Sequence, residues 1–321
     1  MVGIRSLSMT RPIAKFATAA GAFASAAVFS YPSAARADEG PEMVEPSSPW
    51  NIEYAESSCR LSRIFGEGDD TIVLALDRFG PGGGFQMIVA GKELRRLTTR
   101  APVIEVETRF GPYEEATETS AFAGDLGKFK PALIIGGTGL GPDPERHDDD
   151  EFAWDDPTMY EIDPADEEKL IAREARAEWL SVSRGRRIIY LATGPMGEPL
   201  AALRKCSADL LGEWGVDAEA HRTLTRRAMP ISDPGRWVLS NDYPKGLLWQ
   251  GAQGIVRFRL TVDDEGSPVQ CDIQGSTRPE GFETASCDAL MRRAQFAPAI
   301  DAQGNPIKSY YTGTVQFQMG W

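Results

Sequence analysis

The C-terminal part of the chain is organised around residues 270–287, QCDIQGSTRPEGFETASC. The first half alternates apolar and polar residues as a strand does, and the second half has the spacing of a helix. Each half carries one cysteine, Cys271 in the strand and Cys287 in the helix. The stretch therefore predicts a strand followed by a helix. The compartment in which the chain folds decides what the two thiols form. The alternatives are a metal site, a redox pair, a catalytic nucleophile beside an inactive thiol, and a disulfide.

One strand is predicted before this stretch and another after it. In residues 254–262, GIVRFRLTV, apolar residues alternate with polar ones, and the alternation returns in residues 309–319, SYYTGTVQFQM. Cys271 shares its face of the strand with Val269 and Ile273. The order strand, strand, helix, strand predicts a small α+β domain in which the helix covers the apolar face of the sheet.

The N-terminus has the features of a secretory signal peptide. Residues 1–15 are basic and carry no acid, a short apolar run follows, and Ala35 and Ala37 stand at the positions of a cleavage site. We expect cleavage after Ala37 and a mature chain that is periplasmic or secreted, without a membrane span. The alternative is an anchor that stays uncleaved, for which the Ala-rich run is marginal in length.

The compartment decides how the four cysteines are interpreted. Cys59, Cys206, Cys271 and Cys287 form no C-x-x-C pair, and the chain has only two histidines, so the pattern does not offer a zinc site. An even number of dispersed cysteines in a secreted chain predicts disulfides. By proximity we pair Cys271 with Cys287, which would join the helix to the sheet, and we pair Cys59 with Cys206.

Composition and turn signals divide the mature chain into two domains. We expect a β-rich domain over 48–215, a linker over 216–235 and the small domain over 236–321. In the first domain, strands are predicted at 50–55, 71–79, 85–91, 103–110, 131–137 and 186–193, with a hairpin connection at 80–84. Helices are predicted at 163–183, with Asp163 as its cap and Pro164 in its first position, and at 197–215.

The negative charge of the chain is concentrated in one segment. The formal net charge is −13, and residues 143–168 hold thirteen acidic residues and one arginine. Nucleic-acid binding requires Lys and Arg, so this composition argues against such a partner. We expect a solvated acidic insertion. A calcium loop is the alternative, although the Gly and terminal Glu spacing of an EF-hand is missing.

The sequence offers no good case for an enzyme. The glycines of residues 134–146, IIGGTGLGPDPER, have neither G-x-G-x-x-G spacing nor a P-loop lysine. G-x-S-x-G and H-E-x-x-H motifs are missing, and neither His147 nor His221 has an evident catalytic partner. We therefore expect no catalytic residue, cofactor or metal. The alternative is a metal-binding or enzymatic N-terminal domain built around the acidic segment.

Several features of the last 90 residues occur in the same order in one known family. They are Tyr243-Pro244, the strand that begins at Gly254, Gly266 in the following hairpin, the run 292–299 (RRAQFAPA), and Gly304 before the last strand. In these features the region resembles the C-terminal domain of TonB-family energy transducers. The N-terminal domain faintly resembles the invasion-associated locus B type of periplasmic protein, through Trp50 and CRLSRIFG at 59–66.

The resemblance to the TonB family implies a module whose last strand pairs with an extended segment of an outer-membrane receptor. Main-chain groups on an unpaired strand edge supply the affinity of such a complex. The edge would be residues 309–319. The residues expected on its more exposed face are Tyr310, Thr312, Thr314, Gln316 and Gln318. The alternative is that the N-terminal domain or a second copy of the chain covers this strand.

Energy transduction itself would need an anchor and a long proline-rich spacer. This chain instead has a cleavable N-terminus and a folded domain in the place of the spacer. We therefore predict a binding module for an envelope or outer-membrane protein. A membrane-anchored transducer for outer-membrane transport is the alternative. The sequence does not indicate an oligomeric state.

Overall fold

The structure is a computed structural model. It describes residues 41–82, 84–98, 103–113, 116–140, 164–276 and 281–319. The predicted signal peptide, Asp163 and the acidic segment before it lie outside these residues. The described residues form one compact unit. The fold is mixed α+β, as the sequence predicts.

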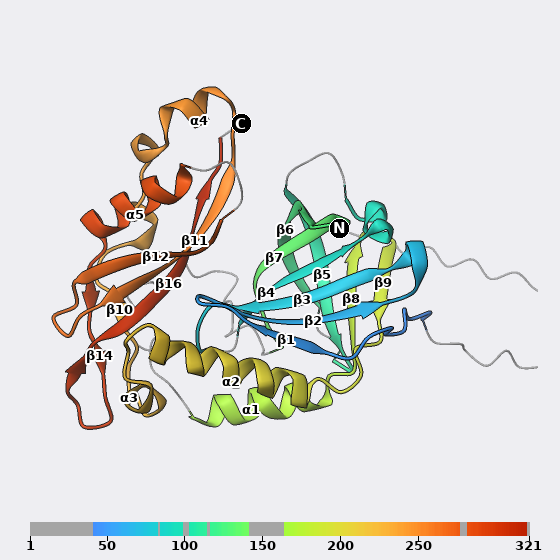
Figure 1. Ribbon diagram of the computed structural model, residues 1–321, viewed down its shortest axis with the longest axis horizontal. Helices are drawn as coiled ribbons and strands as arrows, with labels where there is room; N and C mark the ends of the chain where they lie inside the picture. Colours follow the sequence, from blue (N-terminus) through green and yellow to red (C-terminus); the bar gives the residue numbers. More distant parts are fainter. Residues whose placement is uncertain are drawn as a thin grey trace, which may run out of the picture. The chain divides into compact units, whose positions relative to one another are not determined.

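The described N-terminal strands form one nine-stranded antiparallel sheet (Figure 1). Their order across the sheet is β1-β2-β3-β4-β7-β6-β5-β8-β9. Strand β3, which lies between β2 and β4, is buried along its whole length, which explains its almost continuous apolar run. The bounds are Asn51–Tyr54 (β1), Cys59–Phe65 (β2), Ile72–Arg78 (β3), Phe85–Gly91 (β4), Val103–Gly111 (β5), Thr117–Leu126 (β6), Phe129–Thr138 (β7), Trp179–Arg184 (β8) and Arg187–Leu191 (β9).

A short segment before β1 joins two sides of this sheet. The Val44 N–H donates to the carbonyl of Tyr190 in β9 (2.8 Å), and the Val44 carbonyl accepts from the Ala192 N–H (3.1 Å). Three residues later, the Ser47 N–H donates to the carbonyl of Ile64 in β2 (2.9 Å). The segment thus supplies main-chain partners to β9 and to the part of β2 that β1 does not reach.

Two helices pack beside the sheet. Figure 1 shows α2 (Gly197–Glu213) running alongside α1 (Pro164–Arg176) and next to β1 and β2. The apolar stripe of α2 is buried and belongs to the main core together with the strands. Its members are Leu200, Leu203, Leu210 and Trp214. Burial of this stripe, rather than helix propensity, holds α2 in place.

A buried ion cluster also connects these helices to the sheet. Glu174 of α1 is fully buried and pairs with Arg204 of α2 and with Arg78 of β3, whose Nη2 lies 3.6 Å from Oε1 of Glu174. Burial lowers the pKa of Arg78 to about 10, and the nearby charge of Arg204 acts in the same direction. Removing Glu174 alone would leave two cations without this carboxylate, which is costly in a buried site.

The helix predicted over 163–183 is shorter than expected. It ends at Arg176, and Trp179–Arg184 forms β8, which pairs with β5 and with β9. The prediction of a helix beyond Arg176 was wrong because Trp179, Leu180 and Val182 suit a strand, and pairing with two neighbours outweighs the local helical pattern. Periodicity also failed to identify β2 and β6 as strands, whereas the structure has strands within all six predicted strand segments.

The C-terminal part contains a three-stranded antiparallel sheet with the order β12-β11-β16. Phe258 and Leu260 of β11 pack with Leu290 of α5 in one buried cluster, so the helix covers the apolar face as predicted. The predicted order of strand, strand, helix, strand is confirmed. The bounds are Gly254–Val262 (β11), Pro268–Ser276 (β12), Phe282–Arg293 (α5) and Ser309–Phe317 (β16).

Short elements surround this sheet. Residues 216–235, the predicted linker, contain α3, β10 and part of η4. The division of the chain into two domains there stays a prediction. The bounds are Ala218–Arg222 (α3), Met229–Pro230 (β10), Pro234–Arg236 (η4), Ser240–Asp242 (η5), Lys245–Trp249 (α4), Phe296–Ala297 (β13), Ala299–Ile300 (β14) and Pro306–Ile307 (β15). β10 pairs with β13, and β14 pairs with β15. The remaining 3₁₀ helices are Gly68–Asp70 (η1) and Lys92–Arg96 (η2).

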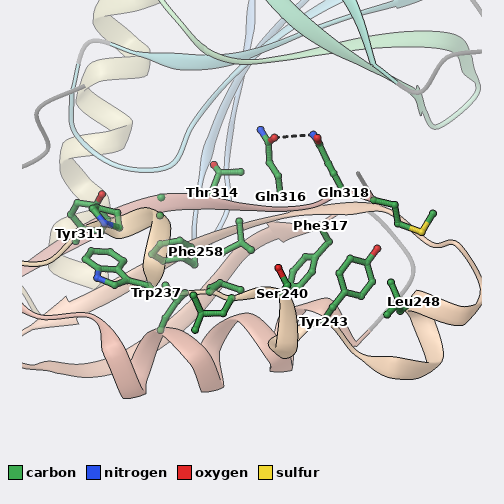
Figure 2. Close-up of a pocket in the computed structure, with 18 residues that line it drawn as sticks. Trp237, Ser240, Tyr243, Leu248, Phe258, Tyr311, Thr314, Gln316, Phe317 and Gln318 are labelled. Carbon is green, nitrogen blue, oxygen red and sulfur yellow. Dashed lines mark hydrogen bonds between the residues drawn. The ribbon is translucent and has the colours of Figure 1, made fainter. Parts of the chain in front are cut away.

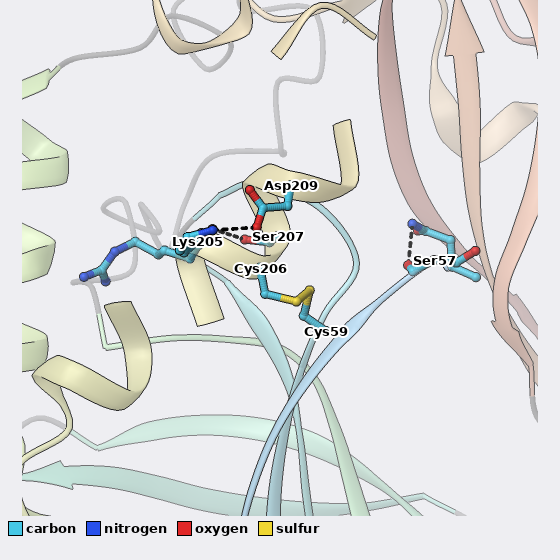
Figure 3. The surroundings of a disulfide bond; sticks show 8 residues. Ser57, Cys59, Lys205, Cys206, Ser207 and Asp209 are labelled. Atoms are coloured by element: carbon cyan, nitrogen blue, oxygen red, sulfur yellow. Dashed lines mark hydrogen bonds and ion pairs between the residues drawn. A yellow bond between two sulfur atoms is a disulfide. The ribbon is translucent and has the colours of Figure 1, made fainter. Parts of the chain in front are cut away.

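Both predicted disulfides are present in the structure. Cys59 of β2 is bonded to Cys206 of α2 (Figure 3), and Cys271 of β12 is bonded to Cys287 of α5. Each bond therefore connects a helix to the sheet against which it packs. The pairing by proximity reproduced both bonds.

Candidate functional site

β16 lies at one edge of the C-terminal sheet. It pairs with β11 in an uninterrupted antiparallel register that runs from Gly254↔Phe317 to Val262↔Ser309. Within the described part of the chain, no strand pairs with its other side. The sequence of β16, SYYTGTVQF, contains no charged residue. β16 is therefore a regular, uncharged edge strand.

The opposite edge of the same sheet, β12, is built differently. Its register with β11 shifts twice, so that Val269 and Gln274 have no residue opposite them in β11. The Gln274 Nε2 donates to the carbonyls of Ser57 (3.2 Å) and Phe79 (2.6 Å), which belong to the N-terminal part of the chain. Bulges and covering loops are common protections of an edge strand against further pairing. β12 has both of these protections.

A groove of about 730 Å³ follows the unprotected edge (Figure 2). Its lining includes the consecutive residues 313–319, whose side chains alternate between the two faces of the sheet, so the groove runs along the backbone of β16. The other wall comes from η4, η5, α4 and the residues between them. This wall consists of Pro234, Gly235, Trp237, Val238, Leu239, Ser240, Tyr243 and Leu248, and the floor includes Phe258, Leu290 and Tyr311.

Aromatic packing fixes the wall of the groove. The Trp237 ring packs against Phe296 (5.3 Å between centroids) and Tyr311 (5.5 Å), and its Nε1 donates to the Ser232 hydroxyl (2.8 Å). An ion pair holds the same segment to α5, because Arg293 donates to the Asp242 carboxylate (2.7 Å). This hydrogen bond is the main reason why the pKa of Asp242 lies below its usual range.

The two residues of the Tyr-Pro motif have structural roles in this region. The Tyr243 ring packs edge-on against Phe282 (5.4 Å) and Phe317 (5.3 Å), and its hydroxyl donates to the Ala252 carbonyl. Desolvation by burial raises the pKa of Tyr243. Pro244 precedes α4, and its carbonyl accepts the Leu248 N–H (2.9 Å). Tyr243 thus joins α5, β16 and the residues just before β11, while Pro244 directly precedes α4.

Most of the predicted edge residues lie along the groove. Figure 2 shows Thr314, Gln316 and Gln318 on one side of β16, with Tyr311 and Phe317 on the other. Thr314, Gln316 and Gln318 are exposed, and the Gln318 side chain donates to that of Gln316 (3.0 Å). Thr312 is half-buried. The accessible part of the edge therefore begins near residue 313.

Tyr310 is not on an exposed face, contrary to the prediction. Its ring packs edge-on against Trp214 (5.2 Å between centroids) and is stacked with His221 (6.0 Å). Desolvation raises the pKa of Tyr310 to about 12, against a smaller opposing effect of Arg227. Contacts with residues far away in the sequence cover this end of β16, and the alternating pattern of β16 alone does not reveal them.

Sequence reasoning missed the second wall of the groove. Trp237, Leu239 and Leu248 line it, yet they precede the alternating strand pattern. The available signal was the run of apolar residues 237–239, which follows Pro234-Gly235 after one arginine. Such a run does not reveal its packing partner, because helical and irregular segments carry similar runs.

The described residues show neither a metal centre nor a helix suited to a membrane. Among them, no three His, Cys, Asp or Glu side chains are grouped as metal ligands would be, and no helix is long and apolar enough to cross a bilayer. The acidic segment proposed as an alternative calcium loop lies outside the described residues up to Asp163. The resemblance of the N-terminal domain to invasion-associated locus B proteins stays a prediction.

Comparison with known proteins concerns the same region as the groove. No curated protein matches the chain. The family model described as Gram-negative bacterial TonB protein C-terminal matches residues 240–319, which include α4, β11, β12, α5 and β16. Residues 240–319 of this chain are a TonB C-terminal domain.

Proposed function

We propose that this protein binds an envelope or outer-membrane protein by pairing β16 with an extended segment of that partner. The observation that carries the proposal is the uninterrupted, uncharged edge of β16 beside an open groove. Unpaired N–H and C=O groups on such an edge bind another strand through main-chain hydrogen bonds. The protein acts through binding in this proposal, and not as an enzyme.

The contrast between the two edges supports this choice of surface. Proteins commonly protect edge strands with bulges, charged side chains or covering loops, because an unprotected edge invites pairing. β12 has two bulges and a side chain held by the N-terminal part, whereas β16 between residues 313 and 317 has neither. One edge of this sheet is protected and the other is regular. The regular edge, β16, is therefore suited to binding an extended segment of another protein.

The proposed location is outside the cytoplasm, in the periplasm or as a secreted protein. Two disulfides link β2 to α2 and β12 to α5, and such bonds persist in oxidising compartments. The predicted signal peptide, residues 1–37, points to the same compartment. An outer-membrane or envelope partner would be accessible there.

Site-specific crosslinking in intact cells tests the proposal. A photo-crosslinking amino acid in place of Gln316 should capture an envelope protein, and mass spectrometry should map the crosslink to an extended segment of it. The matched control is the same amino acid in place of Val269, which is 54% exposed on the protected edge of the same sheet. This control should capture no such segment.

Two outcomes would contradict strand addition at β16. Equal capture from positions 316 and 269 would mean that neither edge is selective. Capture of a second copy of this chain at position 316 would make β16 a contact between identical subunits. A crosslink from position 316 alone to an envelope protein supports the proposal.

A further inference from the structure

The wall of the groove opposite β16 begins before the TonB C-terminal domain. The family match starts at residue 240, whereas Pro234, Gly235, Trp237, Val238 and Leu239 also line the groove. The segment is held in place at Trp237, which is almost fully buried, and at Asp242 by its ion pair with Arg293. This chain therefore adds a fixed wall to the edge strand and turns the edge into a groove.

Two leucines leave apolar surface exposed on this wall. Leu239 and Leu248 each expose 42% of their surface, and both line the groove. Single exposed leucines are common on soluble proteins, but two on one wall of a groove offer apolar surface that a ligand can cover. Figure 2 shows Leu248 beside Tyr243, on the side of the groove away from Thr314 and Gln316.

The groove has no charged side chain among the described residues that line it. The nearby Asp242 is paired with Arg292 and Arg293 and is not itself a lining residue. A charged side chain that entered the groove would lose its hydration without gaining an ionic partner, which is strongly unfavourable. An apolar side chain would instead cover Leu239 and Leu248 favourably.

The geometry of a strand turns these properties into a sequence preference. Successive side chains of an added strand point to opposite faces, with a rise of about 3.3 Å per residue. Alternate side chains would therefore reach the face of Tyr243 and Phe317, and the others would lie on the face of Thr314 and Gln316. β16 and the two residues after it border the groove from residue 313 to residue 319, so about seven residues of a partner can align with them.

We infer that Leu239 and Leu248 select the partner, which is an uncharged extended segment with apolar side chains at alternate positions. The inference rests on the proposed strand addition at β16 and deepens it. Main-chain pairing with β16 supplies affinity for any extended segment, whereas the leucine wall supplies discrimination between segments. Polar uncharged residues suit the intervening positions, opposite the hydroxyl of Thr314 and the amide of Gln316.

Peptide binding to the full-length protein tests the inference. The probes are capped, fluorescent peptides of about seven residues that alternate threonine with either leucine or lysine, measured by fluorescence anisotropy. The leucine peptide should bind, and the lysine peptide should bind at least about tenfold more weakly. The double variant Leu239→Ser/Leu248→Ser should weaken binding of the leucine peptide by about tenfold or more.

The control variant is Ile231→Ser, because Ile231 is 53% exposed and does not line the groove. It should bind both peptides as the unchanged protein does. Circular dichroism and urea unfolding of each variant verify that it is folded. Equal binding of the leucine and lysine peptides, or full binding by the folded double variant, would overturn the inference.

A further probe separates this inference from the proposed function. The probes are two leucine peptides methylated on alternate main-chain nitrogens, one in each possible phase. Because successive N–H groups of a strand point to opposite sides, one phase removes the donors that face β16 and the other phase leaves them. If one phase abolishes binding while the double variant still binds fully, strand addition stands and the role of the leucines is wrong. If both methylated peptides bind as the parent does, the peptide does not add as a strand, and both proposals fail. A dimer that the double variant dissociates would make the groove a self-contact and would overturn the inference.

Discussion

Gly266 and Gly304 have almost the same backbone conformation in different surroundings. Their φ angles are +86° and +84°, a region that costs other residues about 1–2 kcal/mol. A Cβ on Gly266 would lie 2.0 Å from the main-chain oxygen of Phe296, whereas a Cβ on Gly304 would meet nothing within 4 Å. Glycine at 266 therefore allows both the positive φ and the close packing of the hairpin onto Phe296. Glycine at 304 allows only the positive φ of its turn.

Substitution of these glycines by alanine should separate the two effects. We expect Gly304→Ala to lower the free energy of unfolding by about 1 kcal/mol, the cost of the positive φ alone. Gly266→Ala should lower it by about 3 kcal/mol or more, because the backbone must also move away from Phe296. Urea unfolding of both variants measures the difference. Equal losses would show that the close approach to Phe296 is relieved without cost.

At the scale of elements, the two disulfides attach α2 and α5 to the sheets against which they pack. The bond from Cys271 to Cys287 spans a sequence separation of 16, and the bond from Cys59 to Cys206 spans 147. Closing a loop removes conformational entropy from the unfolded chain, and the effect grows slowly with loop length. The bond between β2 and α2 should therefore contribute more than the bond between β12 and α5.

Paired serine substitutions test these contributions. Cys271→Ser/Cys287→Ser should lower the free energy of unfolding by about 3 kcal/mol, and Cys59→Ser/Cys206→Ser by about 5 kcal/mol. Urea unfolding under non-reducing conditions measures both losses. Reduction of both disulfides in the unchanged protein should lower the free energy of unfolding by about the sum of the two losses. A double variant as stable as the unchanged protein would show that its disulfide does not stabilise the fold.

At the scale of the whole molecule, His221 connects α3 to β16. Its Nδ1 lies 2.8 Å from the Asp217 carbonyl, its Nε2 lies 2.9 Å from the Ser309 hydroxyl, and its ring stacks on Tyr310. Desolvation by burial lowers the pKa of His221, although the backbone and charge of Asp217 oppose the shift. The folded protein thus favours the neutral ring.

This shift predicts a loss of stability in mild acid. A histidine whose folded pKa lies below its unfolded value of about 6.5 stabilises the fold fully above that pH, and the contribution disappears as the pH falls through the folded pKa. We expect the free energy of unfolding to decrease from pH 7.5 towards the folded pKa of His221. His221→Gln should show a smaller decrease. NMR titration of the ring and urea unfolding across this range measure both quantities.

Carboxylates act in a different pH range and serve as an internal control. The pKa values of Asp242 and Asp301 are lowered from 3.8, in Asp242 chiefly by a hydrogen bond from Arg293 and in Asp301 chiefly by the backbone N–H of Asn305. Their contributions are present above pH 3.8 and are lost only as the pH falls through their folded values. A decrease between pH 7.5 and 5 that His221→Gln leaves unchanged would rule out His221 as its source.

Local patterns were sufficient for most of the C-terminal fold. The alternation of residues 254–262 and 309–319 identified β11 and β16, and helical spacing identified α5, because each element buries one face against its neighbour. One exception within this sheet, besides Tyr310, is Val269, expected on the buried face beside Cys271. It is 54% exposed because a register shift leaves it without a partner in β11. Bulges depend on both strands, so one strand's pattern does not reveal them.

The sequence by itself determined the order of strands and α5 in the last domain and the uncharged character of β16, because these depend on local periodicity and on residue type. It also determined the disulfide pairings, because pairing the two cysteines nearest in sequence, Cys271 and Cys287, leaves Cys59 and Cys206 for each other. Tertiary structure alone decided the end of α1 at Arg176, the burial of Tyr310 against Trp214 and the groove wall of Leu239 and Leu248. These features arise from contacts between residues distant in sequence. Their free energy outweighs local propensity and leaves no periodic signal in either segment.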